Sequence, residues 1–104
     1  MKQHGDAQKK DLRKAARTLS EALLSLETPA EARAFLEDLC TPAELQALAD
    51  RWAVVDPLSR GEPYRRIHDQ TGVSVTTIGR VARFLTDGNG GYQRVLRRLN
   101  RDAD

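Results

Sequence analysis

The sequence is poor in the residues that build disulfide frameworks and metal sites. Its 104 residues include one cysteine, Cys40, which excludes an intramolecular disulfide and a multi-cysteine metal site. We interpret Cys40 as a buried apolar residue in a reducing compartment. No apolar run approaches the roughly 18 residues that a membrane span needs, and the first residues lack a signal-peptide core. We therefore expect a cytoplasmic protein.

The residues of common catalytic sites are also scarce. The two histidines, His4 and His68, lie far apart in the sequence, and neither has a cysteine or carboxylate at metal-ligand spacing. No glycine-rich phosphate loop follows a strand pattern, and no nucleophile elbow is present. The sequence predicts no enzyme, no metal and no cofactor.

The charge is small overall but unevenly distributed. The net charge is +2, yet residues 60–101 carry nine arginines against three acids, whereas residues 1–59 carry eight basic and ten acidic side chains. Asp102 and Asp104 remove two further charges. A chain whose C-terminal part is rich in arginine and whose N-terminal part is nearly neutral is typical of a protein that binds a polyanion.

The apolar periodicity predicts helices throughout and no strand. Apolar residues at spacings of three and four, among them Leu12, Leu19 and Leu23, form a narrow stripe on a first helix near residues 8–27. Such a stripe usually packs against another apolar surface, which a second subunit could supply. Further helices are expected near residues 29–39, 42–59, 64–71, 75–86 and 91–101.

Two near-copies of one helix-start signal, Thr-Pro-Ala-Glu, begin at Thr28 and Thr41. In each, the threonine can cap the helix, the proline fills the first helical position, and the glutamate can reach back to the threonine N–H. Pro57 conflicts with the helix predicted over 42–59, so that helix ends near Asp56 or kinks there. Trp52 falls on its apolar stripe and is expected in the core.

The stretch from Tyr64 to Val81 has the pattern of a helix-turn-helix, which we expect near residues 64–86. Gly72 allows the left-handed conformation that ends the first helix, and Ser74 can cap the second. Side chains expected to face inward are Ile67, Thr71, Val73, Ile78 and Val81.

The outward side of this motif has side chains suited to DNA. Threonine and valine can contact base edges and thymine methyl groups, arginine can grip guanine or phosphate, and Gly79 allows close approach. Arg65 and Arg66 are placed to clamp phosphates. His68 stands where such motifs usually have a small residue, so we expect it to point outward. The DNA-binding residues predicted are Arg65, Arg66, His68, Ser74, Val75, Thr76, Thr77, Gly79, Arg80 and Arg83.

Residues 36–99 resemble the Trp repressor superfamily, most closely its TrpR-like YerC/YecD group. The matching stretches are Leu39–Leu45, Ala47–Trp52, Arg60–Glu62, Gly72–Val81 and Gly90–Leu96. The resemblance implies a six-helix, all-α fold, an intertwined homodimer, and two recognition helices that read a pseudo-palindromic operator. It also implies DNA contacts from Arg65, His68, Val75, Thr76, Thr77 and Gly79.

The resemblance further implies a ligand site in members that bind tryptophan. Two arginines hold the indole there, and their positions match Arg51 and Arg80. In those members a glycine follows the second arginine, and here that position is Val81. A small polar residue lies further along the same helix in those members, and here that position is Phe84. Both changes add bulk where the ligand would lie, so we predict that L-tryptophan is not a corepressor.

We therefore predict a single domain over residues 1–104, with dimerisation helices (1–60), a helix-turn-helix (61–86) and a loop with a C-terminal helix (87–104). The expected function is a homodimeric DNA-binding regulator, acting as a repressor by steric exclusion. Alternatives are a protein-docking module built on the same motif, a repressor that senses tryptophan or another small molecule, and a DNA-targeting domain of the origin-binding or transposase type. For the last, the catalytic or ATPase partner domain is missing from the sequence.

Overall fold

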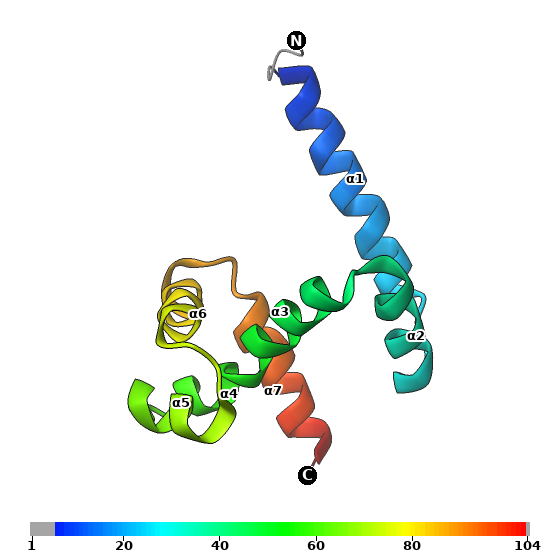
Figure 1. Ribbon diagram of the computed structural model, residues 1–104. Coiled ribbons are helices and arrows are strands. Elements are labelled where there is room, and N and C mark those ends of the chain that lie inside the picture. The colour runs from blue at the N-terminus through cyan, green and yellow to red at the C-terminus, as the bar shows by residue number, and fades with distance from the viewer. Residues whose placement is uncertain (1–5, 104) are drawn as a thin grey trace. The chain divides into compact units, whose positions relative to one another are not determined.

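The computed structural model describes residues 6–103, and side chains from residue 9 to residue 101 (Figure 1). The described chain is helical, and it divides into two compact units, Met1–Thr41 and Pro42–Asp104. The expected all-α class is confirmed. Seven helical segments are present in the described part, two of which, α3 and α4, are the halves of the helix expected over 42–59. Counted as one broken helix, they give the six helices that the resemblance implies.

The first unit consists of α1 (Asp6–Leu24) and α2 (Pro29–Leu39). Thr28 caps α2 as predicted, since its side-chain oxygen accepts a hydrogen bond from the Glu31 N–H (3.1 Å). The Glu31 carboxylate reaches one residue further back than expected, to the N–H of Glu27 (3.0 Å). None of the described side chains in this unit is buried, and Cys40 is only half-buried. The unit therefore has no core of its own.

The second unit begins with α3 (Pro42–Ala53) and α4 (Val55–Ser59), which resolve the conflict posed by Pro57. The chain leaves the helix at Val54 and starts a new one immediately, so Pro57 falls in the first turn of α4. A first-turn residue has no intrahelical partner for its N–H, and proline is tolerated there. The break therefore lies three residues before Pro57, slightly earlier than the expected end near Asp56.

The core of the second unit lies beneath α5 (Tyr64–Thr71) and α6 (Val75–Asp87). Besides Pro57, its buried side chains are Val54, Val55, Ile67, Val73, Ile78 and Val81. Four of these six belong to the helix-turn-helix and were expected to face inward. Val54 and Val55, at the α3–α4 break, belong to the core against which α5 and α6 pack. Residues of α7 (Gly91–Ala103) pack against the same cluster through Tyr92 and Leu96.

A small ion-pair network holds the turn between α4 and α5. The Arg60 guanidinium contacts the carboxylates of Asp56 (2.5 Å) and Glu62 (2.7 Å). The hydrogen bond to Glu62, followed by the charge of Asp56, raises the pKa of Arg60 above its ordinary value. In the described residues, no helix has the length and apolar character required to cross a membrane.

Candidate nucleic-acid interface

The turn between α5 and α6 has the backbone geometry that the sequence predicts. Gly72 adopts a φ of 76° and its N–H donates to the carbonyl of His68 (2.8 Å), which ends α5 in a left-handed cap. Val73 is buried in the turn and belongs to the same core cluster as Ile67 on α5 and Ile78 on α6. The two helices therefore share a closed apolar contact, which fixes the orientation of α6.

Two polar side chains of α5 also fasten this turn, and the sequence did not indicate either bond. Thr71 is exposed rather than inward-facing: its hydroxyl donates to the carbonyl of Ile67 (2.6 Å) and accepts from the N–H of Val73 (3.1 Å). His68 is exposed, as expected, and its Nδ1 donates to the carbonyl of Val73 (2.7 Å). With Nδ1 committed as a donor, the neutral ring presents Nε2 as an acceptor, and it can donate to a phosphate only when protonated.

The first turn of α6 is capped by Ser74, as predicted. The Ser74 hydroxyl accepts from the N–H of Thr77 (3.1 Å) and donates to the Thr77 hydroxyl oxygen (3.0 Å). The Thr77 hydroxyl proton is left available for an acceptor outside the chain. The N-cap thus has a second effect, because it orients a donor at the start of the helix.

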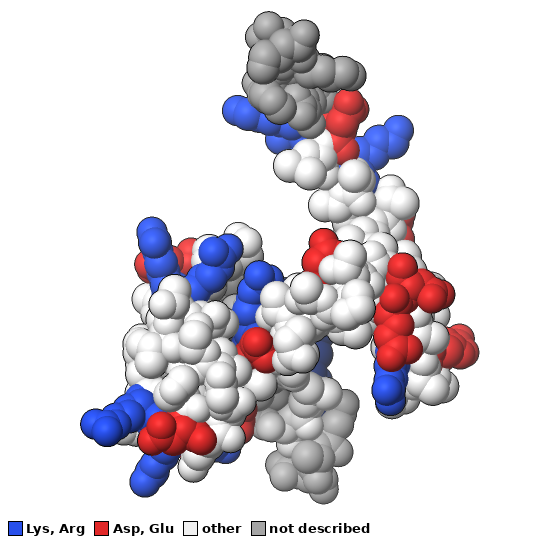
Figure 2. Space-filling model, viewed as in Figure 1, with Lys and Arg blue, Asp and Glu red and all other residues white. Residues whose placement is uncertain are grey.

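The outward side of α6 presents most of the predicted DNA-binding residues on one structural element. Thr76, Arg80 and Arg83 are exposed, Val75 is 52% exposed, and Thr77 and Gly79 are half-buried. Arg65 and Arg66 are exposed at the start of α5. Arginine side chains, drawn in blue, project from the region of α5 and α6 in Figure 2. The ion pairs within the described residues involve Arg33 and Arg60, so none of these four arginines is neutralised by a carboxylate.

Gly79 leaves open space on this surface. A Cβ atom there would meet only Cε2 of Tyr64, at 3.9 Å, which is ordinary van der Waals contact. Packing within the chain therefore does not require glycine at this position, and its helical backbone does not either. Because Gly79 has no side chain, the backbone of α6 is uncovered at the centre of its outer surface.

The positions predicted to hold a ligand lie around α3 and α6, which pack against each other. Arg51 is half-buried in the last turn of α3. The Arg80 guanidinium lies over the Phe84 ring, 5.8 Å from its centroid. Val81 is 1% exposed and forms part of the core. The side chain that replaces the expected glycine is therefore fixed in the interior.

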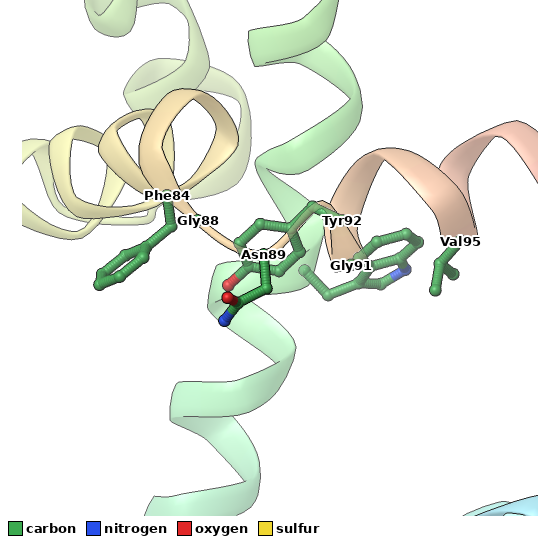
Figure 3. A pocket seen from close by; sticks show the side chains of 7 residues that line it. Phe84, Gly88, Asn89, Gly91, Tyr92 and Val95 are labelled. Carbon is green, nitrogen blue, oxygen red and sulfur yellow. The ribbon is translucent and has the colours of Figure 1, made fainter.

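An apolar pocket of about 490 Å³ opens beside these residues (Figure 3). Its lining comes from α3, the end of α6, the loop that follows and the start of α7: Trp52, Phe84, Gly88, Asn89, Gly91, Tyr92 and Val95. Trp52 is 38% exposed and Phe84 46%. The expectation that Trp52 belongs to the core is wrong for the single chain, because the indole forms a wall of this open pocket.

Comparison with known proteins agrees with this geometry. Residues 14–100 match the profile of the family described as Trp repressor protein. The chain belongs to the Trp repressor family. The uncharacterized protein YerC of Bacillus subtilis (strain 168) is 42% identical over 81 residues, which cover 78% of each chain. This is a family of DNA-binding transcription regulators rather than of enzymes.

Two solved structures share the Trp repressor fold with this chain. A TrpR-like protein from Eubacterium eligens ATCC 27750 aligns with a TM-score of 0.78 and 42% identity, covering 84% of this chain and 90% of that one. A candidate Trp repressor from Staphylococcus aureus gives a TM-score of 0.78 and 40% identity, covering 83% and 86%. The resemblance inferred from the sequence motifs is confirmed.

Proposed function

We propose that this member of the Trp repressor family is a homodimeric, sequence-specific DNA-binding regulator that inserts α6 into the major groove. The observation that carries the proposal is the closed α5–α6 core, which turns a continuous polar and small-residue surface of α6 away from the protein. An α-helix of this kind fits the major groove of B-DNA, where each base pair displays a distinct pattern of donors and acceptors.

The residues of α6 divide into two chemical kinds that together read sequence. The Val75 methyl groups and Thr76 are suited to thymine methyl contacts, and the free Thr77 hydroxyl proton is suited to a base acceptor. Arg80 and Arg83 can each form paired hydrogen bonds to guanine or bind a phosphate. Gly79 lets the backbone of α6 approach the DNA, and Ser74 holds the first turn that carries these groups.

Residues at the start of α5 position the protein on the duplex. Arg65 and Arg66 are exposed, and no carboxylate in the described part of the chain pairs with them, so they can contact phosphates without reading sequence. His68, held by its hydrogen bond to Val73, adds a phosphate contact only in its protonated form.

A second copy of the chain completes the proposed regulator. The first unit has no buried side chain among those described, and Leu12, Leu19 and Leu23 on α1 are exposed along one stripe. The second unit leaves Trp52 and Phe84 uncovered. Both apolar surfaces would be buried in an intertwined dimer, in line with residues 1–60 acting as dimerisation helices. Dimeric helix-turn-helix proteins, the Trp repressor among them, place their recognition helices roughly 34 Å apart, one DNA turn.

We propose further that DNA binding does not need L-tryptophan. Val81 fills the interior where an indole needs space, and the Arg80 side chain that would face the ligand is stacked on Phe84. The protein bound to its operator then represses transcription by excluding other proteins from the same DNA. The second candidate is a regulator that senses a different, apolar small molecule, which the 490 Å³ pocket beside Trp52 favours.

Selection from genomic DNA tests this function. Purified protein is mixed with sheared genomic fragments, with and without L-tryptophan, and the bound fragments are sequenced. We expect one short pseudo-palindrome to be enriched equally in both conditions. Enrichment only with tryptophan would contradict the ligand-independent mechanism but keep the regulator. No enrichment in either condition would contradict sequence-specific DNA binding and favour a protein-docking module.

A further inference from the structure

The last helix, α7, has a face made only of arginine. Its members Arg94, Arg97, Arg98 and Arg101 follow the spacing i, i+3, i+4, i+7, which puts them on one side of a helix. All four are exposed. The predicted DNA-binding surface on α5 and α6 uses none of them.

The orientation of this arginine face is set by the opposite side of the same helix. Tyr92 and Leu96 pack against the buried core, and α7 contacts α4. Because the apolar side is fixed inward, the arginines are held toward solvent as a rigid row. The helix does not need to rotate or unfold to present them.

Among the side chains described, from residue 9 to residue 101, no carboxylate pairs with this face; the ion pairs present there involve Arg33 and Arg60. Like charges at i, i+3 and i, i+4 repel each other and destabilise the helix. An anion that lies along the row would relieve this repulsion. Guanidinium groups bind phosphate with paired hydrogen bonds, which ammonium groups cannot form.

We propose that the arginine face of α7 is a second DNA contact surface, which binds the sugar–phosphate backbone without reading sequence. It rests on the proposed DNA-binding function and adds a surface outside the helix-turn-helix. A duplex has a regular array of phosphates along each strand, which matches a row of four guanidinium groups better than a single small anion does. The contact would extend the protein's footprint beyond the bases that α6 reads.

A pair of charge-matched double variants tests the proposal. R94Q/R98Q removes two cations at i, i+4 from the arginine face, and K10Q/K14Q removes two at the same spacing from the exposed side of α1. Each protein is titrated against a random-sequence duplex of about 40 base pairs at several salt concentrations. R94K/R98K keeps the charge, while circular dichroism and light scattering monitor folding and oligomeric state.

We expect the slope of log affinity against log salt to become less steep by about 1.8 in R94Q/R98Q, because each phosphate that the protein neutralises accounts for about 0.9 of the slope. Affinity at about 0.1 M salt should fall by roughly tenfold or more, while R94K/R98K keeps the slope. For K10Q/K14Q, both the slope and the affinity should stay near the wild-type values.

Equal losses of slope and affinity in both glutamine variants would overturn the proposal in favour of a general charge effect. An unchanged slope would overturn it, and a changed oligomeric state beside it would assign the arginine face to a contact between copies of this chain. If the wild type binds no DNA at all, the proposed function fails as well.

Discussion

The guanidinium of Arg80 lies over the ring of Phe84, one helical turn further along α6, at 5.8 Å from the ring centroid. Arg80 is exposed, so this cation–π contact is worth about 0.5–1 kcal/mol. It keeps the arginine along the surface of α6. Asp50 of α3 does not pair with Arg80, because its carboxylate accepts from the Gln46 amide (2.8 Å).

L-Tryptophan should therefore not stabilise the folded protein. A ligand at a hundred times its dissociation constant adds about 2.7 kcal/mol to the free energy of unfolding, which is easily visible as a rise in melting temperature. We expect no rise with millimolar L-tryptophan in a thermal-unfolding experiment, since Val81 is part of the core. A saturable rise of several degrees would contradict the proposed ligand independence.

Replacing Gly79 with alanine should separate stability from DNA binding. The new methyl group meets only Tyr64 at van der Waals distance, and alanine favours a helix over glycine by about 0.8–1.0 kcal/mol. G79A should therefore unfold at higher denaturant concentration yet bind its DNA site more weakly. T86A makes a control, because it also improves helix propensity but lies in the last turns of α6. Equal DNA affinity in G79A and the wild type would show that DNA does not approach this position.

Replacing Ser74 with alanine should weaken both the helix and the site. The loss of an N-cap costs about 1 kcal/mol, and Thr77 loses the hydrogen bond that orients its hydroxyl. We expect S74A to lower the free energy of unfolding in chemical denaturation and to reduce affinity for the selected DNA site. S74N retains a capping side chain and should recover most of the stability. A full-affinity S74A would show that the Thr77 donor is not used.

A charge on the apolar stripe of α1 should break the proposed dimer. Leu19 is 40% exposed in the single chain, and L19D would put a carboxylate among the leucines that a second copy covers. We expect light scattering to report a monomer for L19D and a dimer for T18D, whose substitution lies off the stripe. A dimeric L19D that binds DNA normally would exclude α1 from the interface.

The helix-turn-helix could be predicted in detail because its determinants are local. Gly72, Ser74 and the inward set of Ile67, Ile78 and Val81 are spaced by helix geometry alone, and each lies where the sequence predicted. The side-chain bonds from Thr71 and His68 to Val73 were not predicted, because they depend on how the turn folds back on α5.

The apolar stripes were harder to interpret because periodicity shows which face is apolar but not what covers it. Trp52 shares a stripe with core residues, yet in the single chain it lines an open pocket with Phe84. Val54 and Val55 enter the core because the helix breaks between Ala53 and Val55 to accommodate Pro57. The sequence indicated the conflict and predicted its relief near Asp56, whereas the chain breaks the helix at Val54.

The most direct test of the account is the ratio of affinities for the selected pseudo-palindrome and for a scrambled duplex of the same length, at one salt concentration. The wild type should show a ratio of roughly a thousand or more, typical of specific DNA-binding proteins. V75A and T77A should lower that ratio, because they alter base contacts on α6. R65A should weaken both duplexes alike and leave the ratio unchanged. A wild-type ratio near one, or a ratio that depends on Arg65 but not on Val75 or Thr77, would contradict sequence reading by α6.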